Sequence, residues 1–181
     1  MGAIEKVLSR NLIYRGKIID LRIDNVQLQS GRKTIREVVE HEPAVAIIPL
    51  TEKNEVLLVR QYRHPLGEDI LEIPAGIVEE GETFRDTAER ELQEEVGYRP
   101  NDLVEVGKFY TSPGFSDEVI VVFVARKLVP SILDGDEDEC IEVESVPLND
   151  VPELLGSGKI KDCKTFAGLS WLLYKHSRRE I

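Results

Sequence analysis

The sequence predicts an α+β protein that is rich in strands and has two packing helices. Two kinds of pattern lead to this fold class. Much of the chain alternates apolar and polar residues, which is the period of a half-buried strand. One central segment and one C-terminal segment instead carry apolar residues at helical spacing. At 181 residues the chain is long enough for a single domain with a sizeable core.

The first part of the chain, residues 12–41, is expected to form β structure. Apolar and charged residues alternate over 19–23. The alternation then changes phase, which predicts a bulge near residues 24–25. Ser30–Gly31 predicts a turn into a second strand at about 33–41.

The central helix is expected to begin after Thr83. Thr83 and Asp86 have the spacing of a capping pair, and Gly97 stands where a C-terminal helix glycine belongs. A buried stripe is formed by Phe84, Ala88, Leu92 and Val96, which recur every fourth residue. The other expected elements are strands at about 44–50, 55–62, 70–73, 103–110, 118–128 and 141–146, a short helix at 151–155 and a terminal helix at 166–175.

The composition limits the classes of partner. A net charge of −11 argues against binding nucleic acid regardless of its sequence, because such binding needs a basic face. An anionic substrate stays possible, since a metal ion and a few arginines can reverse the local field. Cys140 and Cys163 have neither metal-binding spacing nor a disulfide framework, which favours a reducing cytoplasm. No apolar run approaches the roughly 18 residues of a membrane span, so neither nucleic acid nor a membrane is an expected partner.

The segment Arg90–Glu95 places three carboxylates and one guanidinium within two helical turns. Glu91 and Glu95 lie one turn apart at the rim of the buried stripe, and Arg90 precedes Glu94 by four residues, the spacing of a helical ion pair. Carboxylate oxygens one turn apart suit Mg²⁺ or Mn²⁺. A solvent-exposed charged helix face would have the same composition, so the helix alone leaves both interpretations open.

A longer pattern spans Gly76 to Tyr98. It consists of a glycine, five residues, a glutamate, seven residues and then R-E-U-x-E-E-x-G-U, in which U is apolar. Every position fits except the last, where Tyr98 replaces an aliphatic residue. On this pattern, residues of about 44–176 resemble the Nudix hydrolase family. The resemblance implies an α/β/α sandwich around a mixed sheet, and cleavage of a nucleoside diphosphate linked to another group.

The resemblance also implies a metal site. Its members are Glu91 and Glu95 as core ligands, Glu94 as a supporting ligand with a part in catalysis, Glu82 as the residue that orients the helix and assists a metal, and the backbone carbonyl of Ala75. The implied cofactor is Mg²⁺ or Mn²⁺.

A second string, SPGFSDE at 112–118, is similar to the mark of ADP-ribose pyrophosphatases, with Pro113 16 residues after Gly97. It implies hydrolysis of ADP-ribose to AMP and ribose 5-phosphate, with Pro113, Phe115 and Glu118 at the substrate. The string could also be a plain Pro-Gly turn. Two further alternatives are hydrolysis of another nucleoside diphosphate sugar and a non-catalytic module that senses ADP-ribose.

A metal-bound water still benefits from a positioned base, which in this family is usually a glutamate outside the pattern. The acidic stretch 134–139 resembles the loop that carries the base in bacterial ADP-ribose pyrophosphatases. Glu137 is the favoured base, Glu139 is the next candidate and Glu118 is the third.

Two arginines of the string LVRQYRHP are candidate substrate contacts. Arg63 is the expected phosphate contact, because a guanidinium binds phosphate through two hydrogen bonds. Arg60 is the second candidate, since an arginine at a strand end commonly forms a surface ion pair. Tyr14 and Phe115 are options for stacking on adenine.

The chain is expected to divide into an N-terminal antiparallel β subdomain, 1–43, and a Nudix hydrolase domain, 44–181. In ADP-ribose pyrophosphatases such a subdomain often exchanges between subunits. An exposed amphipathic sheet is unfavourable on a monomer. We therefore expect a homodimer through residues of about 1–43.

Overall fold

The computed structural model describes residues 5–135 and 140–180. The chain forms two compact units. The first comprises Met1–Pro43 with Lys108–Ile120, and the second comprises Ala44–Gly107 with Val121–Ile181. The expected division placed residues 108–120 in the second domain, whereas their contacts group them with the N-terminal strands.

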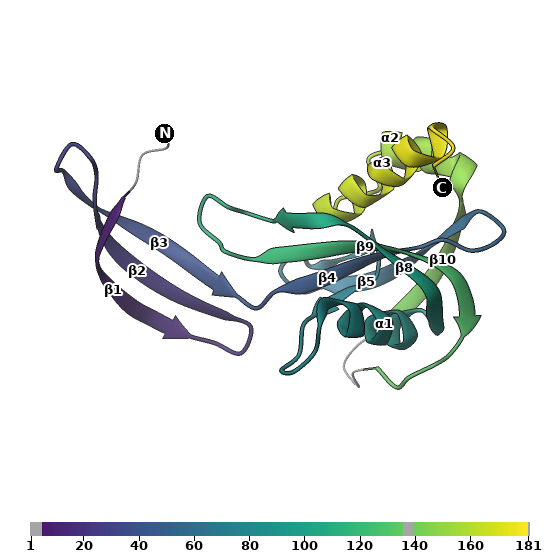
Figure 1. The fold of residues 1–181 in the computed structure, drawn as a ribbon, viewed down its shortest axis with the longest axis horizontal. Coiled ribbons are helices and arrows are strands. Elements are labelled where there is room, and N and C mark those ends of the chain that lie inside the picture. The colour runs from purple at the N-terminus through teal and green to yellow at the C-terminus, as the bar shows by residue number, and fades with distance from the viewer. Residues whose placement is uncertain (1–4, 136–139, 181) are drawn as a thin grey trace. The chain divides into compact units, whose positions relative to one another are not determined.

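In the first unit, the strands β1 (Lys6–Arg15), β2 (Ile19–Gln27) and β3 (Lys33–His41) pair in the order β1-β2-β3 (Figure 1). Both pairings are antiparallel. Strand structure begins earlier than the expected residue 12, because β1 extends the hairpin into a sheet.

The expected bulge in β2 is wrong. The pairing of β2 with β3 has no register shift from Ile19 to Gln27, and the irregularities between β1 and β2 fall on β1. The apolar pattern changes because a charged residue takes a buried position. Asp24 is buried beside Val26, and its carboxylate accepts a hydrogen bond of 3.0 Å from Arg22, which compensates its charge.

The segment 108–120 joins the first unit through backbone hydrogen bonds to β3. Val39 donates to the Phe115 carbonyl at 2.8 Å, and Asp117 donates back to the Val39 carbonyl at 3.2 Å. The His41 amide donates to the Asp117 carboxylate at 3.0 Å. These bonds satisfy backbone groups of β3 that a sheet edge would otherwise leave exposed.

The second unit carries the remaining elements. Its strands are β4 (Ala44–Pro49), β5 (Glu55–Arg63), β6 (Glu68–Glu72), β7 (Ala75–Ile77), β8 (Tyr98–Tyr110), β9 (Val119–Pro130) and β10 (Ile141–Pro147), of which β8 and β9 continue into the first unit. Its helices are α1 (Phe84–Glu95), the 3₁₀ turn η1 (Leu148–Asp150), α2 (Val151–Gly156) and α3 (Cys163–Ser177). Over 44–107, 121–135 and 140–180, the strands pair in the orders β10-β5-β6 and β7-β4-β9-β8.

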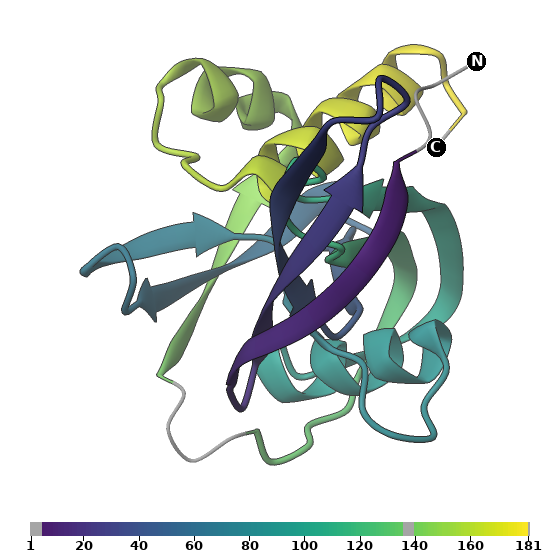
Figure 2. The ribbon, with the colours of Figure 1, turned by 90° about the vertical axis from the view of Figure 1, so that its left-hand side faces the viewer.

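Helices cover both sides of the strands in the second unit (Figure 2). On one side, Ala88 and Leu92 of α1 belong to the same buried cluster as Ile47 of β4. On the other side, α3 packs its Gly168 against Ile48. Ile47 and Ile48 point to opposite faces because side chains alternate along a strand. The expected α/β/α sandwich is therefore confirmed.

The ends of α1 follow the sequence prediction. Thr83 is the N-cap, and its side chain and that of Asp86 form a reciprocal capping box. Gly97 has φ of 77°, the left-handed conformation that glycine adopts most readily. Within the described residues, no helix is long and apolar enough to cross a membrane.

Candidate metal centre and substrate site

Arg90 is the centre of an ionic cluster at α1. Its Nε and Nη2 donate to the two oxygens of Glu82 at 2.8 and 3.1 Å. Its Nη1 donates to Glu91 at 2.7 Å and to Glu94 at 2.8 Å. A further bond of 3.2 Å to the Ile77 carbonyl attaches the guanidinium to the end of β7. Arg90 thus links Glu82 to Glu91 and Glu94 of α1.

The ionisation of this cluster follows from its hydrogen bonds. The bond from Arg90 lowers the pKa of Glu82 to about 2, against an ordinary 4.5. The same bond raises the pKa of Arg90 above its ordinary value. Glu82 therefore stays charged across the neutral range, and its contribution to stability is lost only as the pH falls from about 4.5 towards 2.

Strand β7 contacts the two expected core ligands, Glu91 and Glu95 of α1. The Ala75 amide donates to the Glu95 carboxylate at 3.1 Å, and Gly76 packs directly against the Glu91 carboxylate. Glu91 and Glu95 are buried, with 9% and 8% of their surface exposed. Both carboxylates therefore meet the backbone next to the Ala75 carbonyl, the expected third ligand.

The donors in this cluster fit a hard divalent cation. Arg90 binds the carboxylates of Glu82, Glu91 and Glu94, and Glu95 lies one turn after Glu91 on the same helix. These four carboxylates and one guanidinium sum to a charge of −3. Among the described residues, no three acidic, histidine or cysteine side chains are arranged around one point at metal-binding spacing, and three of the carboxylates instead pair with Arg90. The oxygen atoms that could hold such a cation are those of the Glu91, Glu94 and Glu95 carboxylates and the Ala75 carbonyl.

Gly76→Ala tests the close approach of Glu91. An added Cβ would lie 1.8 Å from a Glu91 oxygen, so the carboxylate must move while the backbone remains in place. We expect kcat for the metal-dependent reaction to fall by about 10- to 100-fold, with less than about 1.5 kcal/mol lost in stability. Steady-state kinetics and thermal unfolding check this. Gly156→Ala, at a helix position with nothing within 4 Å, is the control, and equal activity of the two variants would contradict the explanation.

Arg63 lies in a second ionic group. It donates to both oxygens of Glu72, at 2.7 Å from Nε and 3.1 Å from Nη2, and Lys164 of α3 also binds Glu72. Burial alone would raise the pKa of Glu72, but the hydrogen bond from Arg63 and the charge of Lys164 outweigh it, so this pKa lies below its ordinary value. Sequence reasoning missed Glu72 and Lys164. A charged residue at the end of an apolar strand could have indicated Glu72 as a functional residue.

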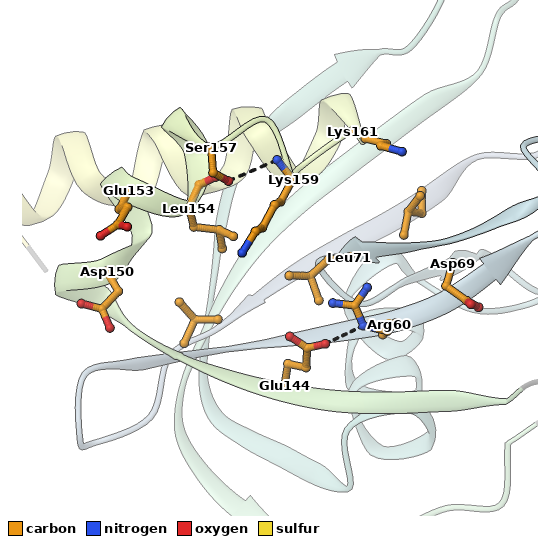
Figure 3. A pocket seen from close by; sticks show the side chains of 12 residues that line it. Arg60, Asp69, Leu71, Glu144, Asp150, Glu153, Leu154, Ser157, Lys159 and Lys161 are labelled. Carbon is orange, nitrogen blue, oxygen red and sulfur yellow. Dashed lines mark hydrogen bonds and ion pairs between the residues drawn. The ribbon is translucent and has the colours of Figure 1, made fainter.

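Arg60 belongs neither to the α1 cluster nor to the ionic group of Arg63. It donates to Glu144 at 2.6 Å and lines a cavity of about 550 Å³ with Leu71, Leu154 and Lys159. Figure 3 shows this cavity between the strands and the connection from α2 to α3. Side chains at alternate positions of β5 pack in the core cluster under α1, so Arg60 faces away from α1. The structure does not bring Arg60 together with the carboxylates of α1.

The SPGFSDE residues lie in the first unit, whereas the carboxylates lie in the second. Pro113 is in a turn in which the Phe115 and Ser116 amides donate to the Ser112 carbonyl. Phe115 is 57% exposed, and Glu118 accepts a hydrogen bond of 2.5 Å from Thr111.

The two favoured bases, Glu137 and Glu139, lie outside the described residues. The preceding glycine is described. Gly135 lies beside Glu94, so that a Cβ on it would be 3.8 Å from the Glu94 Cβ.

The α/β/α sandwich and the acidic helix α1 are the two features that the resemblance to the Nudix hydrolases implies. A family model described as the NUDIX domain matches residues 40–165, and the chain belongs to the Nudix family. Nudix hydrolases generally need divalent metal ions.

Relatives match over nearly the whole chain. An ADP-ribose pyrophosphatase of Bacillus subtilis (strain 168) is 42% identical over 96% of this chain and 95% of its own. A methanol dehydrogenase activator of Bacillus methanolicus is 39% identical over 93% of this chain and 92% of its own. A crystal structure of an ADP compounds hydrolase superposes with a TM-score of 0.88, covering 98% of this chain and 97% of its own at 23% identity, which supports the fold.

Proposed function

We propose that this protein hydrolyses the diphosphate bond of ADP-ribose to AMP and ribose 5-phosphate, with Mg²⁺ or Mn²⁺ as cofactor. The observation that carries the proposal is the cluster of Glu82, Arg90 and three α1 carboxylates, with its net charge of −3. Within this cluster, Glu91 and Glu95 lie against β7 at Gly76 and Ala75. The extensive similarity to an ADP-ribose pyrophosphatase supports ADP-ribose as the substrate. The protein acts in the cytoplasm.

Each residue of the site has a separate role in the proposed reaction. Glu91, Glu95 and the Ala75 carbonyl would hold the cation, and Glu94 would support them. When bound, the cation neutralises charge on the diphosphate and lowers the pKa of a water molecule. Arg63 binds a phosphate oxygen. Water attacks one phosphorus atom, the bridging P–O bond breaks, and the base takes the proton of the water.

Glu137 is proposed as that base, with Glu139 as the alternative. Its support is the family resemblance of the acidic stretch and the contact of nearby Gly135 with Glu94. Glu137→Gln should lower kcat by about 10²- to 10⁴-fold while KM changes little, because a base acts on the transition state. Parallel kinetics of Glu139→Gln identify which glutamate acts. An unchanged kcat in Glu137→Gln would remove it from this role.

The protein is further proposed to be a homodimer through its first unit. Apolar side chains of β1 are each more than 40% exposed, namely Val7, Leu8, Leu12, Ile13 and Tyr14. A three-stranded sheet needs a covered apolar face to be stable, and a second copy would cover it. Light scattering at micromolar concentration should give a mass of about 41 kDa, twice the 20.5 kDa of the chain. Ile13→Asp should shift the mass towards the monomer, and a monomeric wild type would contradict the proposal.

The substrate is tested with a panel of ADP-ribose, ADP-glucose, GDP-mannose and diadenosine polyphosphates. We expect kcat/KM for ADP-ribose to exceed kcat/KM for each of the other compounds by at least about tenfold. Preference for another compound would contradict ADP-ribose as the substrate but not the hydrolysis of a diphosphate bond. Binding of ADP-ribose without turnover of any compound would instead indicate a sensor.

A second candidate function is activation of a dehydrogenase. It is favoured by the 39% identity to a methanol dehydrogenase activator. Adding the protein to a methanol dehydrogenase should then raise its rate, and an unchanged rate would remove this candidate.

A further inference from the structure

Glu72, at the end of β6, is a buried carboxylate shared by two cations. Its surface is 1% exposed. Arg63 contacts its two oxygens through two different nitrogens, and Lys164 contacts one of the same oxygens. A two-point contact fixes the plane of a guanidinium as well as its position. Glu72 therefore determines how Arg63 is oriented.

Lys164 reaches Glu72 from the first turn of α3, and this turn is attached to the same stretch a second time. The Ile73 amide donates to the Thr165 hydroxyl at 2.9 Å. Lys164 also lies 3.1 Å from the Asp162 carboxylate, which caps α3 by accepting from the Thr165 amide at 2.8 Å. The start of α3 thus holds Glu72 and Ile73 through one side-chain and one backbone contact.

Residues 72–76 connect this ionic group to the carboxylates of α1. Three residues after Glu72, the Ala75 amide binds Glu95, and the next residue, Gly76, packs against Glu91. An extended chain covers at most about 10 Å over three residues. The cations and the metal-site carboxylates therefore flank one short segment.

We propose that Glu72 and Lys164 are positioning residues for diphosphate binding. Glu72 holds the Arg63 guanidinium in the orientation that receives a phosphate, and Lys164 holds Glu72. The side chain of Arg63 is 37% exposed and can meet a ligand, whereas those of Glu72 and Lys164 are 2% and 15% exposed. This inference rests on the proposed hydrolase function.

A double-mutant cycle tests whether Lys164 acts through Arg63. Lys164→Met should raise KM for ADP-ribose by about 5- to 20-fold, with kcat changed less than about twofold, because the lost interaction concerns binding. In an Arg63→Met background the same change should have less than about a twofold effect. Lys164→Arg should restore KM to within about threefold of wild type, because it keeps the cation.

The matched control is Lys161→Met. Lys161 lies three residues earlier, is 52% exposed and pairs with Glu68 at 2.6 Å, so its removal deletes a neighbouring charge without touching Glu72. Its KM should remain that of wild type. If Lys164→Met does not fold, as judged by thermal unfolding, Glu72→Gln replaces it in the cycle with the same expected result.

The same double-mutant cycle is measured a second time by calorimetry, as Kd values for ADP-ribose in the absence of metal. These values do not depend on turnover. Equal effects of Lys164→Met with and without Arg63 would overturn the positioning role. A wild type that binds ADP-ribose with the expected cycle but does not hydrolyse it would refute the proposed function alone. A wild type that neither binds nor hydrolyses ADP-ribose would refute both.

Discussion

Glu95→Gln is expected to lower kcat for the metal-dependent reaction by about 10³-fold or more, which corresponds to roughly 4 kcal/mol in the barrier. A neutral amide is a much poorer ligand for Mg²⁺ than a carboxylate. The fold should remain, because the glutamine oxygen can still accept the hydrogen bond from the Ala75 amide. The loss should therefore lie in metal binding and chemistry.

Glu89→Gln is the matched control. Glu89 lies on the same helix and pairs with Arg85 at 3.3 Å, so this variant removes the same charge away from the cluster. Its kcat should stay within about twofold of wild type. Kinetics over a range of Mg²⁺ concentrations and thermal unfolding of both variants check the prediction. A destabilised Glu95→Gln that keeps full activity would favour a structural role for the carboxylates.

Arg90→Met is expected to have the largest effect on stability. Arg90 is the shared partner of Glu82, Glu91 and Glu94, whose side chains are 12–20% exposed. Without it, neighbouring carboxylates of like charge remain together in a mostly buried position. Loss of one partner from a buried pair costs about 3–5 kcal/mol, and partial exposure reduces this to about 2–3 kcal/mol, or roughly 5–10 °C in Tm.

Divalent metal should reverse part of this loss, because a cation among the carboxylates replaces the missing positive charge. Addition of millimolar Mg²⁺ should therefore raise the Tm of Arg90→Met more than that of wild type. The control is Arg85→Met, which removes a 55% exposed arginine of the same helix and should show no added response. An equal Mg²⁺ response in Arg90→Met and wild type would contradict a metal site at this cluster.

Local patterns were sufficient to predict α1 and its carboxylates. The capping box at Thr83 and the glycine at 97 depend on neighbours within a few residues, and the structure has both. The apolar stripe determines which face of α1 is buried, and hence that Glu91 and Glu95 lie at its edge. The strands of the second unit were predicted for the same reason, apart from the three-residue β7.

Contacts between distant residues could not be predicted in this way. Lys164 is 92 residues from Glu72, and no local pattern relates them. Likewise, no local pattern predicts the hydrogen bonds between β3 and residues 115–117. Because of these contacts, residues 108–120 belong to the first unit. In β2, the charged Asp24 interrupts the alternation of apolar residues, and this interruption led to the wrong prediction of a bulge. Asp24 is buried because Arg22 binds its carboxylate, and such a side-chain pair leaves no trace in the apolar pattern.

Metal-dependent hydrolysis of ADP-ribose is tested most directly by stripping the protein of metal, supplying ADP-ribose, and identifying the products before and after Mg²⁺ is added. We expect no product before Mg²⁺ is added, and AMP and ribose 5-phosphate in equal amounts afterwards. Equal turnover with and without Mg²⁺, or cleavage at a bond other than the diphosphate, would contradict this expectation.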